Sequence, residues 1–212
     1  MNVATLFYIY DPMCSWCWGY NRTWSLLKAQ LKKQFSQLNI EYRLGGLAAD
    51  TQEPMPKEMQ LTLQQIWHRI EAELGAQFNF DFWSQCQPRR ATYPASRALI
   101  LARDQALEVP YYLAVQQAYY LQAKNPSDDA TLIDIAIKLG MDGDAFSHAL
   151  NSEATQNRLL QEFAQTRRLP MQGFPSLVMA LNGELIAIEL DYLQAQTSFN
   201  QIAALMESGS TR

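Results

Sequence analysis

Two cysteines three positions apart stand where the first expected strand gives way to the first expected helix. Cys14 and Cys17 follow the apolar and aromatic run Leu6-Phe7-Tyr8-Ile9-Tyr10, which has the length of a strand, and a helical pattern begins after Gly19. A helix N-terminus presents unpaired N–H groups and the positive end of the helix dipole. Both favour the thiolate, which is the reactive form of cysteine. The position therefore predicts a cysteine pair suited to disulfide exchange.

Two other uses of a Cys-x-x-Cys pair fit this chain less well. A zinc site needs further ligands at suitable spacing, and the sequence offers only Cys86, His68 and His148, none of them arranged as a second ligand pair. A purely structural disulfide over so short a span closes a small loop and constrains the unfolded chain little. The redox use is therefore favoured, and no metal site is expected.

Composition and charge argue against two classes of partner. The net charge of −4 over 212 residues disfavours a nucleic-acid surface, which usually needs a basic face. No apolar run approaches the roughly 20 residues of a membrane span, so no membrane partner is expected. Residues 1–5 lack the basic and then apolar segments of an export signal. A cytoplasmic location follows as an expectation, and an odd number of cysteines fits its reducing environment.

The first segment of the chain predicts a strand, a helix and a second strand. Apolar residues recur at helical spacing after the cysteines, at Trp24, Leu26, Leu27, Leu31 and Phe35. Residues 38–44 then alternate between apolar and polar, as in a strand, and Gly45-Gly46 ends the run. A strand–helix–strand unit of this length implies a parallel pair of strands joined by a right-handed crossover.

The rest of the chain predicts a block of helices followed by a hairpin and a last helix. Helical patterns cover residues 57–76, 94–106, 111–123, 128–139, 144–150 and 152–168. Cys86 falls between them, in an expected loop ending at Pro88, and is most simply a buried or idle thiol. Strands are expected at 176–181 and 184–190, joined by the hairpin signal Asn182-Gly183, and a helix at 194–206.

Two motifs in this order resemble the DsbA-like thiol–disulfide oxidoreductase family, in its cytoplasmic, FrnE-like branch. They are Asp11-Pro12-Met13-Cys14-Ser15-Trp16-Cys17-Trp18-Gly19 and Gly173-Phe174-Pro175-Ser176-Leu177-Val178. The resemblance implies an α/β chain with a thioredoxin fold and a helical insertion between its βαβ and ββα halves. Residues 1–50 and 152–212 would form the thioredoxin-fold domain, and residues 51–151 the inserted helical subdomain.

The same resemblance implies a role for each residue of the two motifs. Cys14 would be the exposed nucleophile and Cys17 the resolving thiol. Pro175 would be a cis-proline facing the pair, and the unpaired backbone of Phe174 would bond an extended substrate. The substrate-binding positions would be Ser15, Trp16, Phe174 and Pro175.

The chain departs from its relatives at two positions. Ser15 stands where many of them have proline, and this dipeptide helps to set thiolate stability. Tyr8 stands six residues before Cys14, where thioredoxin-like proteins often carry a buried carboxylate. The proton-carrying role of that acid is then either absent or taken by Asp11 or by water. Asp11 alternatively begins a turn before Pro12, and turn preference favours this interpretation of Asp11.

The family resemblance implies thiol–disulfide exchange or disulfide isomerisation through a mixed disulfide, with no metal or organic cofactor. The expected partners are proteins with disulfides or dithiols and a thiol electron donor or acceptor, with glutathione as a candidate co-substrate. One alternative is a glutathione-dependent enzyme of the kappa-class transferase or 2-hydroxychromene-2-carboxylate isomerase type. Such relatives generally carry serine at the position of Cys14. A weaker alternative is a chaperone that binds peptides without turnover.

Overall fold

The computed structural model describes residues 4–209, and its first three elements form the expected βαβ unit. They are β1 (Thr5–Tyr10), α1 (Ser15–Gln34) and β2 (Asn39–Leu44). The two strands pair in parallel, from Thr5 opposite Asn39 to Tyr10 opposite Leu44. Residues 1–3, on which part of the export-signal argument rests, lie outside the described residues.

The C-terminal hairpin completes the sheet. β3 (Ser176–Leu181) pairs antiparallel with β1, and β4 (Glu184–Ile188) pairs antiparallel with β3. Within the described residues the strand order is therefore β2-β1-β3-β4. Asn182 and Gly183 both have positive φ, at 52° and 85°, as a tight hairpin turn requires. The expected hairpin is confirmed, although its second strand ends two residues early.

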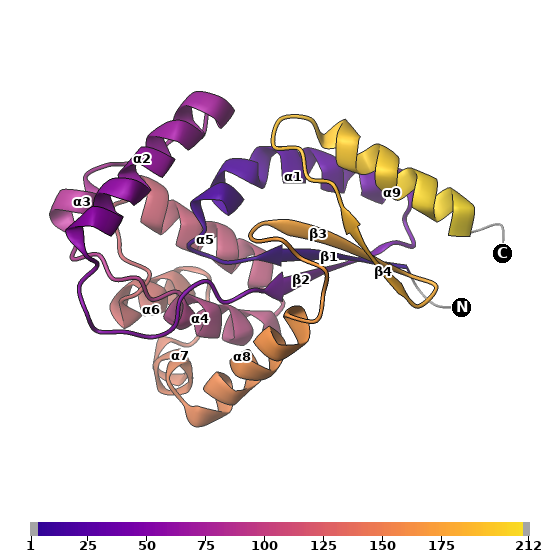
Figure 1. Cartoon of the computed structure of the whole chain (residues 1–212). Helices are drawn as coiled ribbons and strands as arrows, with labels where there is room; N and C mark the ends of the chain where they lie inside the picture. The colour runs from indigo at the N-terminus through magenta and orange to yellow at the C-terminus, as the bar shows by residue number, and fades with distance from the viewer. Residues whose placement is uncertain (1–3, 210–212) are drawn as a thin grey trace.

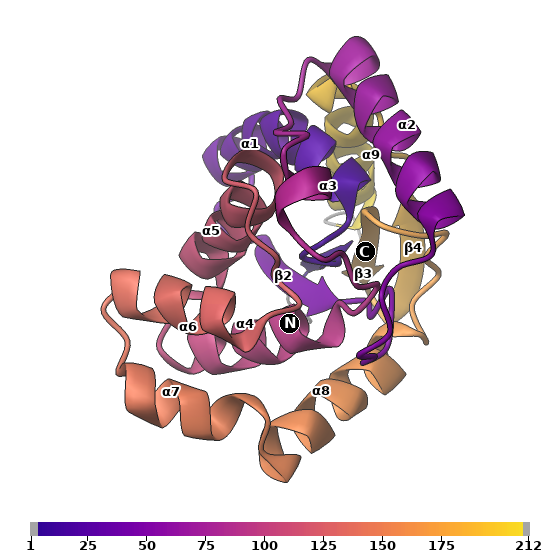
Figure 2. The same ribbon diagram turned by 90° about the vertical axis from the view of Figure 1, so that its left-hand side faces the viewer.

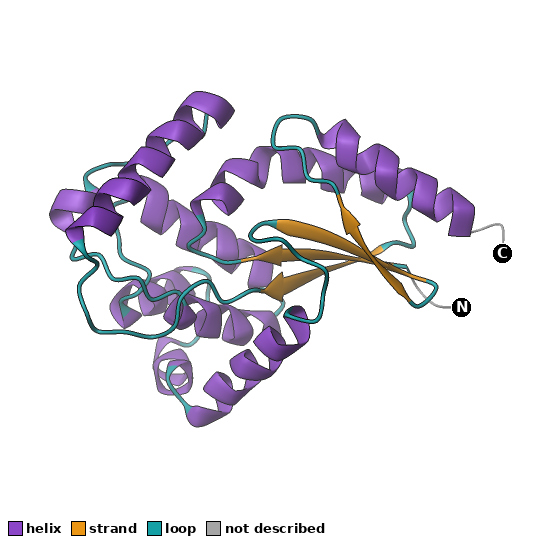
Figure 3. Cartoon of the chain, viewed as in Figure 1, coloured by secondary structure: helices purple, strands orange, loops and turns teal. Residues whose placement is uncertain are grey.

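The helices between β2 and β3 lie where the insertion was expected, except the last of them, which falls in residues 152–212 of the expected thioredoxin-fold domain. In chain order they are α2 (Lys57–Leu74), α3 (Phe82–Gln85), α4 (Tyr93–Asp104), α5 (Glu108–Leu121), α6 (Asp129–Lys138), α7 (Gly143–Leu150) and α8 (Glu153–Thr166). A last helix, α9 (Ala195–Gly209), lies beside α1 on one side of the sheet, whereas α8 lies on the other (Figures 1 and 3). The boundaries of the inserted subdomain stay a prediction.

Three details of the helical region differ from the sequence expectation. The short helix α3 replaces part of an expected loop, because Phe82 and Trp83 pack on the buried ring of Trp67. The helices α4 and α5 begin earlier than expected. Pro94 and Pro110 lie in their first turns, where a missing N–H is tolerated. Figure 2 shows α2 standing apart from α4, α6, α7 and α8.

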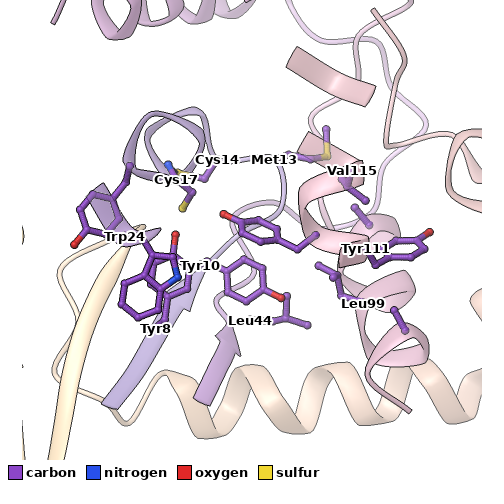
Figure 4. Close-up of a cluster of buried hydrophobic side chains, with 14 of the residues drawn as sticks. Tyr8, Tyr10, Met13, Cys14, Cys17, Trp24, Leu44, Leu99, Tyr111 and Val115 are labelled. Atoms are coloured by element: carbon purple, nitrogen blue, oxygen red, sulfur yellow. The ribbon is translucent and has the colours of Figure 1, made fainter. Parts of the chain in front are cut away.

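One hydrophobic core joins the sheet to the inserted helices and reaches the cysteine pair. Tyr8 and Tyr10 of β1 are fully buried, and Tyr10 meets Tyr112 of α5 with ring centroids 4.5 Å apart. Figure 4 shows Cys17 pointing into this core near Tyr8 and Tyr10. In the described part of the chain, no helix is long and apolar enough to cross a membrane.

Candidate active site

Cys14 occupies the N-cap position of α1. Its backbone is extended, at φ −77° and ψ 115°, and its N–H donates to the Asp11 carbonyl at 3.1 Å. The Cys14 Sγ accepts a hydrogen bond from the Cys17 N–H at 3.4 Å, as the oxygen of a capping side chain does in other helices. This position places the sulfur where the helix end favours negative charge.

The two thiols differ in their access to solvent. Cys14 is 7% exposed and Cys17 is 0% exposed, and neither is in a disulfide. The expectation of an exposed nucleophile is therefore wrong, because Cys14 is nearly buried, although it lines a cavity. Burial, followed by the hydrogen bond and charge of Cys14, raises the pKa of Cys17 well above its ordinary value. Cys17 is thus a protonated thiol near neutral pH.

The Phe174–Pro175 peptide bond is cis, as expected, and its loop touches Cys14. The Cys14 thiol donates to the Phe174 carbonyl at 3.3 Å. The expectation that the Phe174 backbone is unpaired is therefore wrong for its carbonyl. Its N–H, by contrast, has no acceptor among residues 4–209. A free N–H beside the sulfur suits pairing with an extended segment.

A cavity of about 350 Å³ opens over Cys14. Ser15, Trp16 and Phe174 line it together with Cys14, whereas Pro175 is buried and lines a neighbouring hollow of about 560 Å³ that shares Phe174. The structure thus brings the expected substrate-binding residues together, although they are divided between two adjoining hollows, and the buried Cys17 lines neither. The far wall of the cavity comes from the insertion and was not expected from the sequence.

Trp16 is held from two sides at the mouth of the cavity. Its ring lies edge to face against Tyr192, with centroids 5.2 Å apart. The Arg69 guanidinium of α2 lies 5.3 Å from its centroid, which is a cation–π distance. Trp16 therefore links the inserted helix to the loop after β4, next to Cys14.

The buried Asp11 carboxylate holds three residues of the cavity wall in place. Its carboxylate, 0% exposed, accepts hydrogen bonds from the Met13 N–H at 2.9 Å, the Leu47 N–H at 2.8 Å and the Thr92 hydroxyl at 2.7 Å. All three donor residues line the cavity. Burial raises the Asp11 pKa, and these hydrogen bonds partly oppose the shift. The contact with Met13 is the expected turn, but no sequence signal connects Asp11 to Thr92.

Tyr8 does not supply the charge of the buried acid that was expected of thioredoxin-like proteins at this position. The side chain is fully buried, and burial raises its pKa well above the ordinary value of 10.0. Its ring stacks on Trp24 with centroids 4.5 Å apart. Tyr8 therefore stays protonated near neutral pH and fills the core beneath the cysteines.

Gly45 allows Phe174 to lie against the end of β2. A Cβ atom at Gly45 would lie 1.8 Å from the Phe174 Cε1 atom, far inside contact distance. The position of the Phe174 ring, and with it one wall of the cavity, therefore depends on the absence of a side chain at this residue.

Solved structures share this architecture at low sequence identity. A candidate protein disulfide isomerase from Nitrosomonas europaea is 24% identical, with a TM-score of 0.80 over 97% of this chain and 98% of that one. The cytosolic disulfide reductase DsbM from Pseudomonas aeruginosa is 22% identical, with a TM-score of 0.74 over 96% and 99%, and has also been solved with GSH. A 2-hydroxychromene-2-carboxylate isomerase is 17% identical, with a TM-score of 0.62 over 96% and 95%.

Sequence comparison finds a curated relative and a family. The ClpXP adapter protein SpxH of Bacillus subtilis is 24% identical over 170 residues, which cover 79% of this chain and 55% of SpxH. The chain thus spans about half the length of the curated relatives it matches. The family model described as the DSBA-like thioredoxin domain matches residues 5–197. With nearly the whole chain matched, the protein belongs to the DSBA-like thioredoxin domain family.

Proposed function

We propose that this protein is a cytoplasmic thiol–disulfide oxidoreductase or disulfide isomerase that cycles Cys14 and Cys17 between dithiol and disulfide. The placement of the Cys14 sulfur carries the proposal, because this sulfur caps α1 and lines a cavity beside the loop of Phe174. A helix N-terminus favours negative charge placed at it, and the neighbouring Phe174 N–H, which has no acceptor among residues 4–209, can bond to a substrate backbone.

The proposed reaction has two exchange steps. The Cys14 thiolate attacks one sulfur of a substrate disulfide, so that the S–S bond breaks, a mixed disulfide forms and one substrate thiolate leaves. Cys17 then loses its proton and attacks the Cys14 sulfur, which releases the second substrate thiolate. The substrate gains two electrons, and the enzyme is left with the Cys14–Cys17 disulfide. Reversal of these steps oxidises a dithiol.

The pKa of Cys17 gives these steps an order. Negative charge on Cys14 is one of the causes that raise the Cys17 pKa. Formation of the mixed disulfide removes that charge, because the Cys14 sulfur is then bonded to the substrate. The proton on Cys17 therefore becomes easier to lose only after the first step, which keeps the resolving thiol inactive until substrate is attached.

The proposed partners are proteins that carry disulfides or dithiols, together with a thiol that restores the enzyme. Glutathione is the proposed co-substrate, and the structure of the related DsbM solved with GSH supports it. The description of DsbM as a cytosolic reductase likewise supports a cytoplasmic location. The cysteines carry the electrons, so the mechanism requires no metal or organic cofactor.

A second candidate function is a glutathione-dependent isomerase or transferase acting on a small molecule. The structural similarity to 2-hydroxychromene-2-carboxylate isomerase and the size of the cavity favour it. The presence of both cysteines favours disulfide exchange instead.

An insulin-reduction assay with dithiothreitol, run beside a glutathione-conjugation assay, tests the proposal. We expect this protein to accelerate insulin reduction and to leave conjugation at its background rate. Conjugation without insulin reduction would support the second function and contradict the first. Activity in neither assay, with suppression of insulin aggregation, would indicate a peptide-binding chaperone.

Gly45→Ala is expected to slow disulfide exchange while the chain still folds. The added methyl group displaces the flexible Phe174 ring, and misplacement of reacting groups by about 1 Å can lower a rate by up to about 100-fold. Gly143→Ala is the matched control, because its methyl group also meets a side chain, Ile137, and neither residue lines the cavity. Equal exchange rates in the two variants would show that the Phe174 ring position does not matter.

A further inference from the structure

Arg90 is a cation without a counterion in the cavity that holds Cys14. Both residues line the same cavity of about 350 Å³. The Arg90 side chain is half-buried, and the polar contact it makes is from Nη1 to the Met59 Sδ at 3.8 Å. A thioether is a weak acceptor, whereas a guanidinium carries five donors and keeps its charge. Among residues 4–209, no carboxylate lies within ion-pair distance of Arg90.

The two charged neighbours of Arg90, Arg89 and Asp11, already have partners of their own. Arg89, which also lines the cavity, pairs with the Asp128 carboxylate and donates to the Ser127 carbonyl at 2.7 Å. Asp11 lies close enough for the charge of Arg90 to lower its pKa, but its carboxylate accepts from the Met13 N–H, the Leu47 N–H and the Thr92 hydroxyl. The buried Nε of Arg89 has no hydrogen-bond partner, but the Arg89 charge is paired with Asp128. Among residues 4–209, Arg90 is thus the arginine of this cavity that lacks a carboxylate partner.

A half-buried cation without a partner is unfavourable in the empty protein, and a bound anion would relieve that penalty. Carboxylates match the planar fork of a guanidinium and form two parallel hydrogen bonds with it. The remaining cavity wall is mostly apolar, with Met55, Leu63, Ile66 and Trp67 among its residues, and suits a short hydrocarbon chain. The cavity therefore combines a reactive sulfur, an apolar wall and an unpaired cation.

We propose that Arg90 binds the carboxylate of a substrate whose sulfur reacts with Cys14, so that the preferred substrates are thiols or disulfides carrying a carboxylate near the sulfur. This inference rests on the proposed exchange function and names its substrate class. The carboxylate takes no part in electron transfer. It holds the substrate in place while an S–S bond breaks and the Cys14–substrate bond forms; the bond that breaks is that of a disulfide substrate, or the Cys14–Cys17 bond of the oxidised enzyme when the substrate is a thiol.

A kinetic comparison of two small disulfides tests the role of Arg90. The reduced protein is mixed with dithiodipropionate, a dicarboxylate, or with bis(hydroxyethyl) disulfide, which is neutral, and the ratio of their second-order rate constants is measured. We expect Arg90→Gln to lower the dicarboxylate-to-neutral ratio by about tenfold, since a hydrogen bond to a charged group is lost. Arg90→Lys should retain part of the ratio, because it keeps the charge without the fork.

Arg22→Gln is the charge-matched control, since Arg22 is exposed on α1 and does not line the cavity. Its ratio should equal that of the wild type. Added salt should lower the wild-type ratio and leave that of Arg90→Gln nearly constant. Equal ratios for the wild type and Arg90→Gln would overturn the inference.

Binding without chemistry separates this inference from the proposed function. In Cys14→Ala, calorimetry should show tighter binding of dithiodipropionate than of the neutral disulfide, and the preference should disappear when Arg90→Gln is added. Absence of a preference in Cys14→Ala would contradict the Arg90 assignment even if exchange is fast. A preference without any exchange in the wild type would support the carboxylate site and contradict the oxidoreductase.

Peptides identify where the carboxylate comes from. Two peptide disulfides are compared that differ only in glutamate or glutamine beside the cysteine. A glutamate preference that depends on Arg90 would indicate protein substrates with acidic flanks. A preference for dithiodipropionate over the neutral disulfide, without a preference for the glutamate peptide, would indicate that the substrates are low-mass thiols. Absence of a preference both between the small disulfides and between the peptides would overturn the inference.

Discussion

Cys14→Ser is expected to reduce disulfide exchange to the rate measured without enzyme. A serine hydroxyl is not ionised near neutral pH and does not attack disulfides, whereas the rest of the site should keep its shape because serine is also a good N-cap residue. The measurement is the rate of insulin reduction, with the circular dichroism spectrum as evidence that the variant is folded. Exchange at the wild-type rate would place the nucleophile elsewhere.

Cys17→Ser separates the two steps of the mechanism. Cys14 is intact in this variant, so the first attack should proceed, but no thiol remains to release the substrate. A mixed disulfide on Cys14 should therefore accumulate and be visible as an added substrate mass. If the adduct formed on Cys86 instead, the assignment of the nucleophile would be wrong. If full turnover persisted, Cys17 would not be the resolving thiol.

Asp11→Ala is expected to cost about 3 kcal/mol of stability or more. It leaves three donors without their acceptor beneath the cavity, and each buried donor left unsatisfied costs about 1–3 kcal/mol. Asp191→Ala is the matched control, because Asp191 also accepts from two backbone N–H groups, those of Leu193 and Gln194, and from the Thr197 hydroxyl. It lies near the surface, where water replaces the lost acceptor, so its loss should cost under about 1 kcal/mol.

Urea unfolding of the wild type and both variants measures the difference. Equal losses in the two variants would show that burial of the Asp11 contacts is unimportant. A loss in Asp11→Ala below about 1 kcal/mol would contradict its role in holding the cavity walls.

The same pair of variants should respond to pH in opposite directions. Burial raises the folded-state pKa of Asp11 above the ordinary value of 3.8. The titration of Asp11 therefore stabilises the folded state fully below pH 3.8, and this contribution is lost as pH rises through the folded-state pKa. Hydrogen bonds from Leu193 and Gln194 lower the pKa of Asp191 below 3.8. The titration of Asp191 therefore stabilises the folded state above pH 3.8, and this contribution is lost as pH falls through the folded-state pKa. Between pH near 7 and pH near 4, the deficit of Asp11→Ala should therefore grow relative to that of Asp191→Ala.

Local patterns predicted the parts of the fold that depend on neighbouring residues. The alternation through Ile40 and Tyr42 identified β2, and Asn182-Gly183 identified the hairpin. Both succeeded because the strand period and the turn geometry are determined by a few adjacent residues. The place of Cys14 at the start of α1 followed from the same kind of pattern. The helix α3 was missed, since Phe82 and Trp83 are helical through packing on Trp67 rather than through a local pattern.

The far wall of the site could not be predicted in this way. Thr92 reaches Asp11 across 81 positions of sequence, and no spacing rule connects such residues. No sequence spacing connects Arg90 with Cys14, and only the folded chain places both in one cavity. The burial of Cys14 likewise depends on the loops that surround it, including Phe174 from the other end of the chain.

A redox titration tests the central claim most directly. The protein is equilibrated with a series of glutathione buffers, quenched with a thiol label and analysed by peptide mapping. We expect a reversible two-electron transition, in which a tenfold change in the dithiol-to-disulfide ratio takes about 30 mV, with Cys14 joined to Cys17 in the oxidised form and Cys86 labelled throughout. A pair that stays fully labelled in every buffer, or an oxidised form that joins Cys86 to another cysteine, would contradict the claim that Cys14 and Cys17 form the working disulfide.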